Sequence, residues 1–167
     1  MNRTLLYLFF ITLPGNNNIY ARNFSFVPKH IVILDSSKTK ETLDQPSRYA
    51  LKKYDRPFVL TDKDLLLLER NFKKIYGIKV SDKHCCKTNG KVDSLDKYAF
   101  QLVGVVIKGK KYIYINAFEA ASDEYLEERR ENWKSVPVVL TDGGESYWGA
   151  FFEIDKKVFS KLAFNGG

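Results

Sequence analysis

The sequence predicts an α+β protein in which one helix packs on a curled antiparallel β-meander of four to five strands. Three observations predict this class: a capped stretch with helical spacing over about 62–76, two alternating β-rich runs joined by a glycine turn, and further β-rich runs near the end of the chain. With 167 residues, 44% of them hydrophobic, the chain is long enough for one ordinary core. We therefore expect one α+β domain over residues 61–167, preceded by a partly irregular N-terminal arm over residues 22–60.

The helix is predicted from its caps and from the spacing of its apolar residues. Thr61 or Asp62 is a suitable N-cap, and Gly77 is a suitable stop. One apolar face is expected to lie on the sheet, and it consists of Leu65, Leu68, Phe72 and Ile75.

The first hairpin is predicted over 98–107 and 111–118. With Gly109 and Lys110 as a two-residue loop, Ile107 pairs with Tyr112 and Val105 with Tyr114. Alternation then separates two faces. The apolar face is assigned to the helix, with Gly104 small enough for a close approach, and it carries Phe100, Leu102, Gly104, Val106, Ile113, Ile115 and Ala117. The opposite face is aromatic and polar, and it carries Gln101, Tyr112, Tyr114, Asn116 and Phe118.

The remaining segments are predicted from turn residues and β-rich runs. Residues 136–141 and 146–154 are expected to be strands around a tight turn at 142–145, and residues 158–164 form the last strand. The charged stretch 123–134 is expected to be a short helix or a loop, and the polar stretch 35–48 a surface loop or mobile arm. In element order alone, this layer resembles the cystatin-like arrangement.

A second resemblance rests on short motifs in the C-terminal part. Tyr98 and Gln101 precede the glycine hairpin, the run 112–118 follows it, and the motifs Asp142-Gly143-Gly144, Tyr147-Trp148 and Phe164-Asn165-Gly166 come later. Over about residues 97–166 the chain resembles a group of small exported bacterial proteins with no assigned activity. The resemblance implies export and a compact α+β domain, and it assigns no catalytic residue.

Residues 1–21 are typical of a signal peptide. The apolar run 5–13 lies within the roughly 7–15 residues of a signal core and below the roughly 18 needed to cross a bilayer. Ala21 provides a small residue for cleavage before Arg22. We expect export to the periplasm or the extracellular space and no transmembrane segment; a buried N-terminal strand is the alternative.

The charge pattern predicts a solvated basic surface. Lys and Arg number 27 against 20 Asp and Glu, a net charge of +7, but they are scattered. The small groups are Lys52-Lys53, Lys73-Lys74, Lys108-Lys110-Lys111 and Lys156-Lys157. No nucleic-acid-binding motif accompanies them, so no nucleic-acid partner is expected; an anionic partner remains the alternative.

The two cysteines, Cys85 and Cys86, are adjacent and are unsuited to an ordinary disulfide within the chain. With His84 they favour a plain loop over a metal site or an intermolecular disulfide. No metal or other cofactor is expected.

The aromatic and polar face requires a cover, because its rings would otherwise form a large exposed patch with Tyr147 and Phe151. The favoured cover is the arm, residues 24–60, as a second core layer. The alternatives are a partner protein and a buried ligand pocket.

The leading hypothesis is an exported, non-enzymatic binding domain that uses this face. The predicted contact residues are Gln101, Tyr112, Tyr114, Asn116, Asp142, Tyr147 and Trp148. A protein partner or a second copy of the chain is favoured over a glycan. The alternative is a small secreted hydrolase that uses Asp142 and Glu145 as a carboxylate pair, with or without Ca²⁺, although a purely structural turn is favoured for these two residues.

Overall fold

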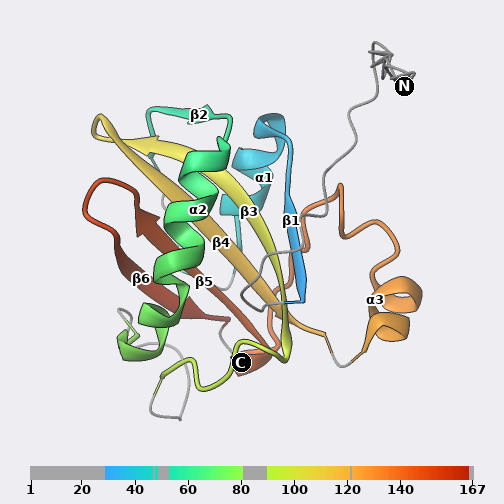
Figure 1. Cartoon of the computed structure of the whole chain (residues 1–167). Coiled ribbons are helices and arrows are strands. Elements are labelled where there is room, and N and C mark those ends of the chain that lie inside the picture. Colours follow the sequence, from blue (N-terminus) through green and yellow to red (C-terminus); the bar gives the residue numbers. More distant parts are fainter. Residues whose placement is uncertain (1–28, 47, 49–52, 81–89, 121, 166–167) are drawn as a thin grey trace, which may run out of the picture.

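The computed structural model describes residues 29–46, 48, 53–80, 90–120 and 122–165. It shows an α+β protein with a mixed, open six-stranded sheet and a few helices (Figure 1). The expected signal peptide and the Cys85–Cys86 pair lie outside the described residues. Within them, no helix is long and apolar enough to cross a membrane.

Four long strands form an antiparallel meander at one side of the sheet. They are β3 (Tyr98–Ile107), β4 (Lys110–Glu119), β5 (Tyr147–Glu153) and β6 (Val158–Phe164).

Two short strands from the N-terminal arm share the outer edge of β3. The first, β1 (His30–Ile33), runs parallel to the beginning of β3, and the second, β2 (Arg56–Phe58), runs antiparallel to its end. The arm thus contributes directly to the sheet. A single helix on a purely antiparallel meander is therefore not confirmed, because the sheet contains a parallel strand and carries helices on both of its faces.

The predicted helix is confirmed as α2 (Asp62–Asn71), which continues as a 3-10 turn, η2 (Phe72–Gly77). Thr61 and Asp64 form a reciprocal capping box, in which each side chain accepts a hydrogen bond from the other residue's backbone N–H. The predicted apolar face packs on the apolar face of the β3–β4 hairpin, and its four residues are at most 3% exposed: Leu65, Leu68, Phe72 and Ile75.

The predicted register of the hairpin is wrong by two residues. Val103, not Val105, pairs with Tyr114. The loop residues are Lys108 and Gly109, with φ of 50° and 75°, values typical of a type I′ turn. Because the shift is even, every side chain keeps its predicted face.

The close approach at Gly104 is made by β2 and not by the helix. A Cβ at this position would stand 3.0 Å from Cε1 of Phe58 and still nearer to the carbonyl oxygen of Phe58. Phe58 is the residue paired with Gly104, so the glycine admits the neighbouring strand.

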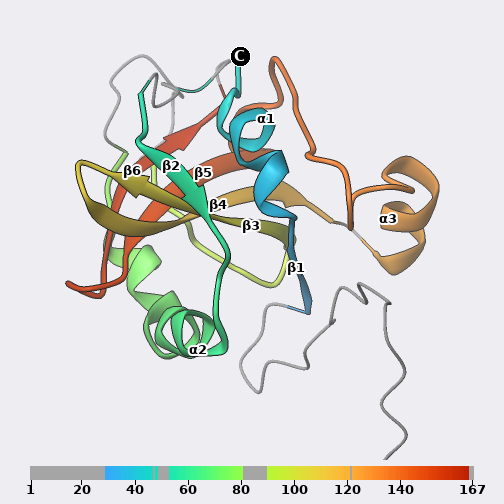
Figure 2. The same cartoon turned by 90° about the horizontal axis from the view of Figure 1, so that it is seen from above.

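The aromatic and polar face is covered by the chain itself. Residues 35–48, expected as a surface loop, instead form a 3-10 turn, η1 (Ser36–Lys38), and a short helix, α1 (Thr39–Leu43). Figure 2 shows α1 and α2 on opposite sides of the sheet. A second apolar cluster lies beneath this cover, and it includes Val32, Leu34, Leu43, Tyr114, Phe118, Trp133 and Phe151.

The connection between β4 and β5 also differs from expectation. Its charged part contains a short helix, α3 (Asp123–Arg129), one of the two predicted alternatives. Residues 136–141 form no strand, and the turn before β5 is a short 3-10 element, η3 (Gly144–Ser146). The predicted hairpin around 142–145 is wrong, because β5 pairs with β4 and β6 only.

Candidate functional site

The structure buries most of the predicted contact residues. Gln101 and Trp148 are 0% exposed, Asn116 is 1% exposed and Tyr114 is 5% exposed. Trp148 moreover lies on the opposite face, in the core beneath α2, where its ring meets that of Phe100 edge to face. None of these four side chains is accessible to a partner.

The other three predicted contact residues lie nearer to solvent. Tyr112 and Tyr147 are half-buried and Asp142 is exposed. The hydroxyl of Tyr112 donates to Glu153 at 3.3 Å, and burial raises the pKa of Tyr112 above its ordinary value, as does the charge of Glu153. Tyr147 is held by Arg130, whose Nη2 donates to the tyrosine hydroxyl at 2.8 Å.

The centre of the covered face is a buried cation, Arg48, which is 7% exposed. Its Nη1 donates to Oδ1 of Asn116 at 2.8 Å and to the hydroxyl of Tyr114 at 3.2 Å, and its Nε donates to Oδ1 of Asn165. All three acceptors are uncharged side chains. Burial lowers the pKa of Arg48 below its ordinary value, and Tyr114 opposes that shift. The charge of Arg48 is therefore stabilised by amide and hydroxyl dipoles.

Two buried amides continue this network to the backbone of the β4–β5 connection. Nδ2 of Asn116 donates to Oε1 of Gln101 at 3.0 Å and to the carbonyl of Val138 at 2.9 Å. Nε2 of Gln101 donates to the carbonyls of Trp133 at 2.5 Å and Val136 at 2.7 Å. The N–H of Val138 donates back to Oε1 of Gln101 at 2.8 Å. These side chains form the hydrogen bonds to the backbone of residues 133–138 that a neighbouring strand would form in a sheet.

Two further side-chain amides complete the attachment. Nδ2 of Asn165 donates to the carbonyls of Leu140 at 3.1 Å and Asp142 at 3.2 Å. Nε2 of Gln45 donates to the carbonyl of Val138 at 3.1 Å. Residues 133–142 are thus fastened along their inner side by Gln45, Gln101, Asn116 and Asn165. We call residues 130–142 the tethered loop.

The outer side of the tethered loop is partly apolar and is hollowed. Val136 is 43% exposed and Val139 is 41% exposed. A hollow of about 240 Å³ is lined by Arg130, Glu131, Asn132, Trp133, Val136, Pro137, Val138 and Val139. Trp133 is itself 5% exposed and is fixed edge to face against His30, with ring centroids 6.4 Å apart. The loop therefore presents apolar side chains on a rigidly held backbone.

Asp142 and Glu145 take part in the fold through their main chains. The carbonyl of Asp142 accepts from Asn165, and the carbonyl of Glu145 accepts from the hydroxyl of Tyr98 at 3.0 Å. Both side chains are exposed. Gly143 and Gly144 have φ of 113° and 54°, which only glycine adopts without strain. This geometry favours a turn role for the segment over acid–base chemistry, and no three His, Cys, Asp or Glu side chains of the described residues are grouped to hold a metal ion.

Sequence reasoning missed Arg48 as the organising residue. A signal is nevertheless present, because Thr39, Thr42, Gln45 and Arg48 recur at every third position and all four are buried. Of these four, Gln45 and Arg48 meet polar groups of the covered face. The sequence singled out Asn165 only as part of the Phe164-Asn165-Gly166 motif. The structure shows that its side chain donates to the carbonyls of Leu140 and Asp142.

Comparison with known proteins gave no matching family model, no matching curated protein and no matching solved structure. The functional assignment therefore depends on the geometry of the chain.

Proposed function

We propose that the chain is an exported, non-enzymatic binding domain whose contact surface is the outer side of the tethered loop. The observation that carries this proposal is the contrast between its two sides. The inner side is fastened by four amide side chains, whereas Val136 and Val139 on the outer side are exposed. A loop held in one conformation before binding loses little conformational entropy when a partner docks.

The partner is a protein or a second copy of the chain. The apolar wall formed by Val136, Pro137 and Val139 is flanked by the polar residues Arg130 and Glu131, the pattern of a protein interface with an apolar centre and a polar rim. The hollow of about 240 Å³ is smaller than the roughly 300–1,000 Å³ of typical small-molecule pockets. It suits one or two side chains of a partner. A glycan is less favoured, because Tyr114, expected as part of a stacking platform, is 5% exposed.

Export is supported by the sequence of residues 1–21 and by the resemblance to small exported bacterial proteins. The resemblance to a cystatin-like arrangement is retained for α2 with β3 to β6, as a proposal about element order.

The experiment compares two double variants, each of which replaces two exposed apolar side chains, on different parts of the surface. Val136→Gln with Val139→Gln alters the tethered loop. The control is Leu66→Gln with Val59→Gln: Leu66 lies on α2 and is 48% exposed, and Val59 lies shortly before α2 and is 75% exposed. Native chain and variants are immobilised and exposed to an envelope extract of the source cells, and self-association is followed by sedimentation. We expect the tethered-loop variant alone to lose its partner, or its self-association, at an unchanged melting temperature. Equal retention by both variants would show that the tethered loop is not the contact surface.

A further inference from the structure

The meander brings lysines from two separate turns together at one end of its strands. In a meander, alternate hairpin turns lie at the same end, so the β3–β4 turn and the β5–β6 turn are neighbours. Tyr112 pairs with Glu153 across β4 and β5, and the N–H of Ile154 donates to the carbonyl of Lys111 at 3.1 Å. The lysine groups that are scattered along the sequence thus converge in space, and those on the two turns are Lys108, Lys110, Lys111, Lys156 and Lys157.

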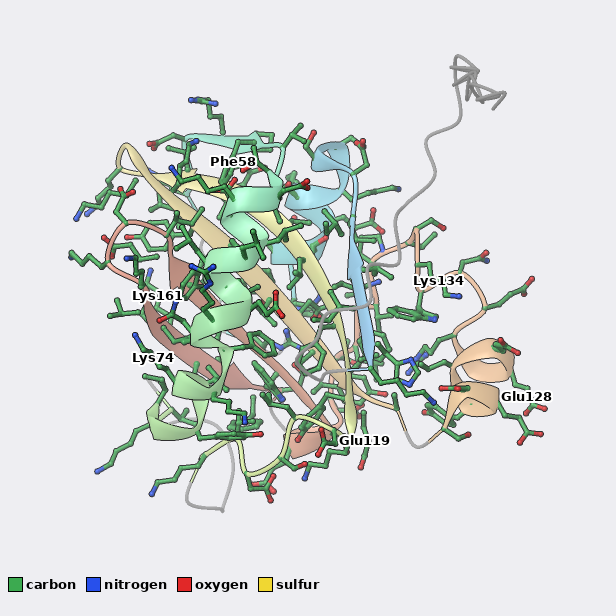
Figure 3. The ribbon with its side chains drawn as sticks, viewed as in Figure 1. Phe58, Lys74, Glu119, Glu128, Lys134 and Lys161 are labelled. Atoms are coloured by element: carbon green, nitrogen blue, oxygen red, sulfur yellow. The ribbon has the colours of Figure 1, made fainter. Side chains whose placement is uncertain are left out.

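Two more lysines lie on the same side. Nζ of Lys74 donates to the carbonyl of Lys157 at 3.3 Å, and Figure 3 shows Lys74 and Lys161 together on this side, away from Glu119 and Glu128. We call these seven residues the lysine edge: Lys74, Lys108, Lys110, Lys111, Lys156, Lys157 and Lys161.

Carboxylates at this edge offset only part of the charge. Glu153 is 8% exposed and lies between Lys110 at 3.9 Å and Lys156 at 3.5 Å. Asp55 accepts from the N–H of Gly109 at 2.8 Å, and Asp155 lies in the β5–β6 turn. These three carboxylates are fewer than the seven lysines, so positive charge predominates among the residues named here.

Backbone strain points to the same residues. Within the described part of the chain, the non-glycine residues with positive φ are Lys108, Lys157 and Lys161, at 50°, 56° and 53°. This left-handed conformation favours glycine and asparagine, and Asn-Gly is the preferred pair in a type I′ turn. The backbone therefore gives no reason for lysine at these three positions. A left-handed residue that the backbone does not require favours a role for its side chain, although Nζ of Lys161 also contacts the ring of Phe151 at 5.7 Å.

We propose that the lysine edge docks on an anionic phospholipid surface. Its cations are ammonium groups on flexible stems, three of them in the two hairpin turns, which suits a diffuse anionic surface, whereas bidentate phosphate recognition in nucleic acids favours arginine. Nζ of Lys111 lies over the ring of Phe58 at 5.1 Å, so that ring is covered and not free to stack on a base. Val158, next to Lys157, is 43% exposed and suits the headgroup boundary.

The lysine edge and the tethered loop lie at opposite ends of β4 and β5, because the tethered loop belongs to the connection from Glu119 to Tyr147. A lipid surface and a partner protein are therefore bound at separate places. The inference goes beyond the proposed function and does not depend on it.

The test is co-sedimentation of the purified chain with phosphatidylcholine vesicles, with and without phosphatidylglycerol. Lys108→Asn with Lys157→Asn removes two charges from the lysine edge, and Lys91→Asn with Lys97→Asn removes two exposed charges elsewhere. We expect native chain to bind only the anionic vesicles, with binding weakened by salt. The Lys108/Lys157 variant should bind on the order of thirtyfold more weakly, since each lysine near an anionic surface contributes about fivefold, and the Lys91/Lys97 variant should bind as the native chain does.

The same variants separate a binding role from a structural one. The melting temperature of the Lys108/Lys157 variant should equal or exceed that of the native chain, because asparagine tolerates positive φ better than lysine. Should this variant fold poorly, Lys74→Gln with Lys111→Gln removes the same charge without altering either left-handed turn residue. Equal loss in the Lys91/Lys97 variant, binding to neutral vesicles, or tighter binding to a DNA oligonucleotide than to anionic vesicles would overturn the proposal.

Discussion

Arg48 donates its Nε–H to the side-chain oxygen of Asn165, although 117 residues separate the two in the chain. The contact joins the arm to the end of β6 beneath the tethered loop. It places a cation among neutral acceptors at a site that is 7% exposed, and the consequences for stability are measurable.

Replacing Arg48 with Met should destabilise the chain by about 3 kcal/mol. The side chain would still fill the space, but the oxygens of Tyr114, Asn116 and Asn165 would lose their donor while buried, and each such loss costs about 1–3 kcal/mol where no other donor reaches it. Urea unfolding measures the change. The matched control is Arg56→Met, an exposed arginine whose replacement should cost less than about 0.5 kcal/mol. Equal costs for the two variants would contradict the organising role of Arg48.

Tyr112 and Tyr114 lie on one face of β4 but should differ sharply on replacement by Ala. Tyr114 is 5% exposed and packs against Phe151 with ring centroids 4.8 Å apart, so Tyr114→Ala should cost about 3 kcal/mol or more. Tyr112 is half-buried, and Tyr112→Ala should cost clearly less. Thermal unfolding of both variants checks the order; the reverse order would mean that the face is open in solution.

Gly149 should tolerate a side chain poorly, because it lies against the buried network around Arg48. A Cβ there would stand 2.8 Å from Nη1 of Arg48 and nearer still to the hydroxyl of Tyr114. We expect Gly149→Ala to cost about 1–3 kcal/mol, because the displaced groups belong to the buried network. Gly77→Ala is the control, since a Cβ at Gly77 meets nothing within 4 Å. A melting temperature unchanged in both variants would show that Arg48 and Tyr114 can move aside for the methyl group without loss of stability.

His30 should make the chain less stable in mild acid. Burial, the largest cause, lowers the pKa of His30 below 6.5, and Lys29 and Lys134 act in the same direction against Asp123, whose Oδ1 lies 2.9 Å from Nε2. The unfolded chain therefore binds this proton more readily, so stability falls as pH drops through 6.5 and below. Urea midpoints between about pH 5 and pH 8 should fall more steeply in acid for the native chain than for His30→Gln. A steeper fall in the variant would reverse the sign of this argument.

The export hypothesis is tested at the predicted cleavage site. The N-terminal sequence of the chain recovered from the secreted or envelope fraction should begin at Arg22, because Ala21 is the small residue that precedes it. Replacing Ala21 with a bulky residue such as Leu should leave the longer form. Recovery of the full-length native chain from the cytosol would contradict export.

The sequence predicts best where one physical signal acts alone. Capping and apolar spacing located α2, and alternation assigned both faces of the β3–β4 hairpin correctly. The register failed because Lys108 adopts a left-handed conformation that its residue type does not favour. The missed parallel pairing of β1 needs contacts between residues about seventy positions apart, which no local pattern reveals.

The candidate site could be predicted only in part, because polar groups there satisfy one another. Val136 and Val138 look like strand residues, but their hydrogen bonds go to Gln101 and Asn116 and not to a strand. Likewise Gln45 and Arg48 look like surface residues until the polar face beneath them is known. Hydrophobicity patterns indicate which apolar residues are buried. They do not show which polar residues are buried with a hydrogen-bond partner.

The long span between Arg48 and Asn165 also determines when the fold can close. A chain made from its N-terminus reaches Arg48 long before Asn165, so the hydrogen bond between the two can form only after β6 has been synthesised. The arm can pair with β3 earlier, through β1 and β2, but the network around Arg48 stays incomplete until Asn165 is present. For the export that we propose, this order favours delivery of the chain to translocation machinery before its folding is complete.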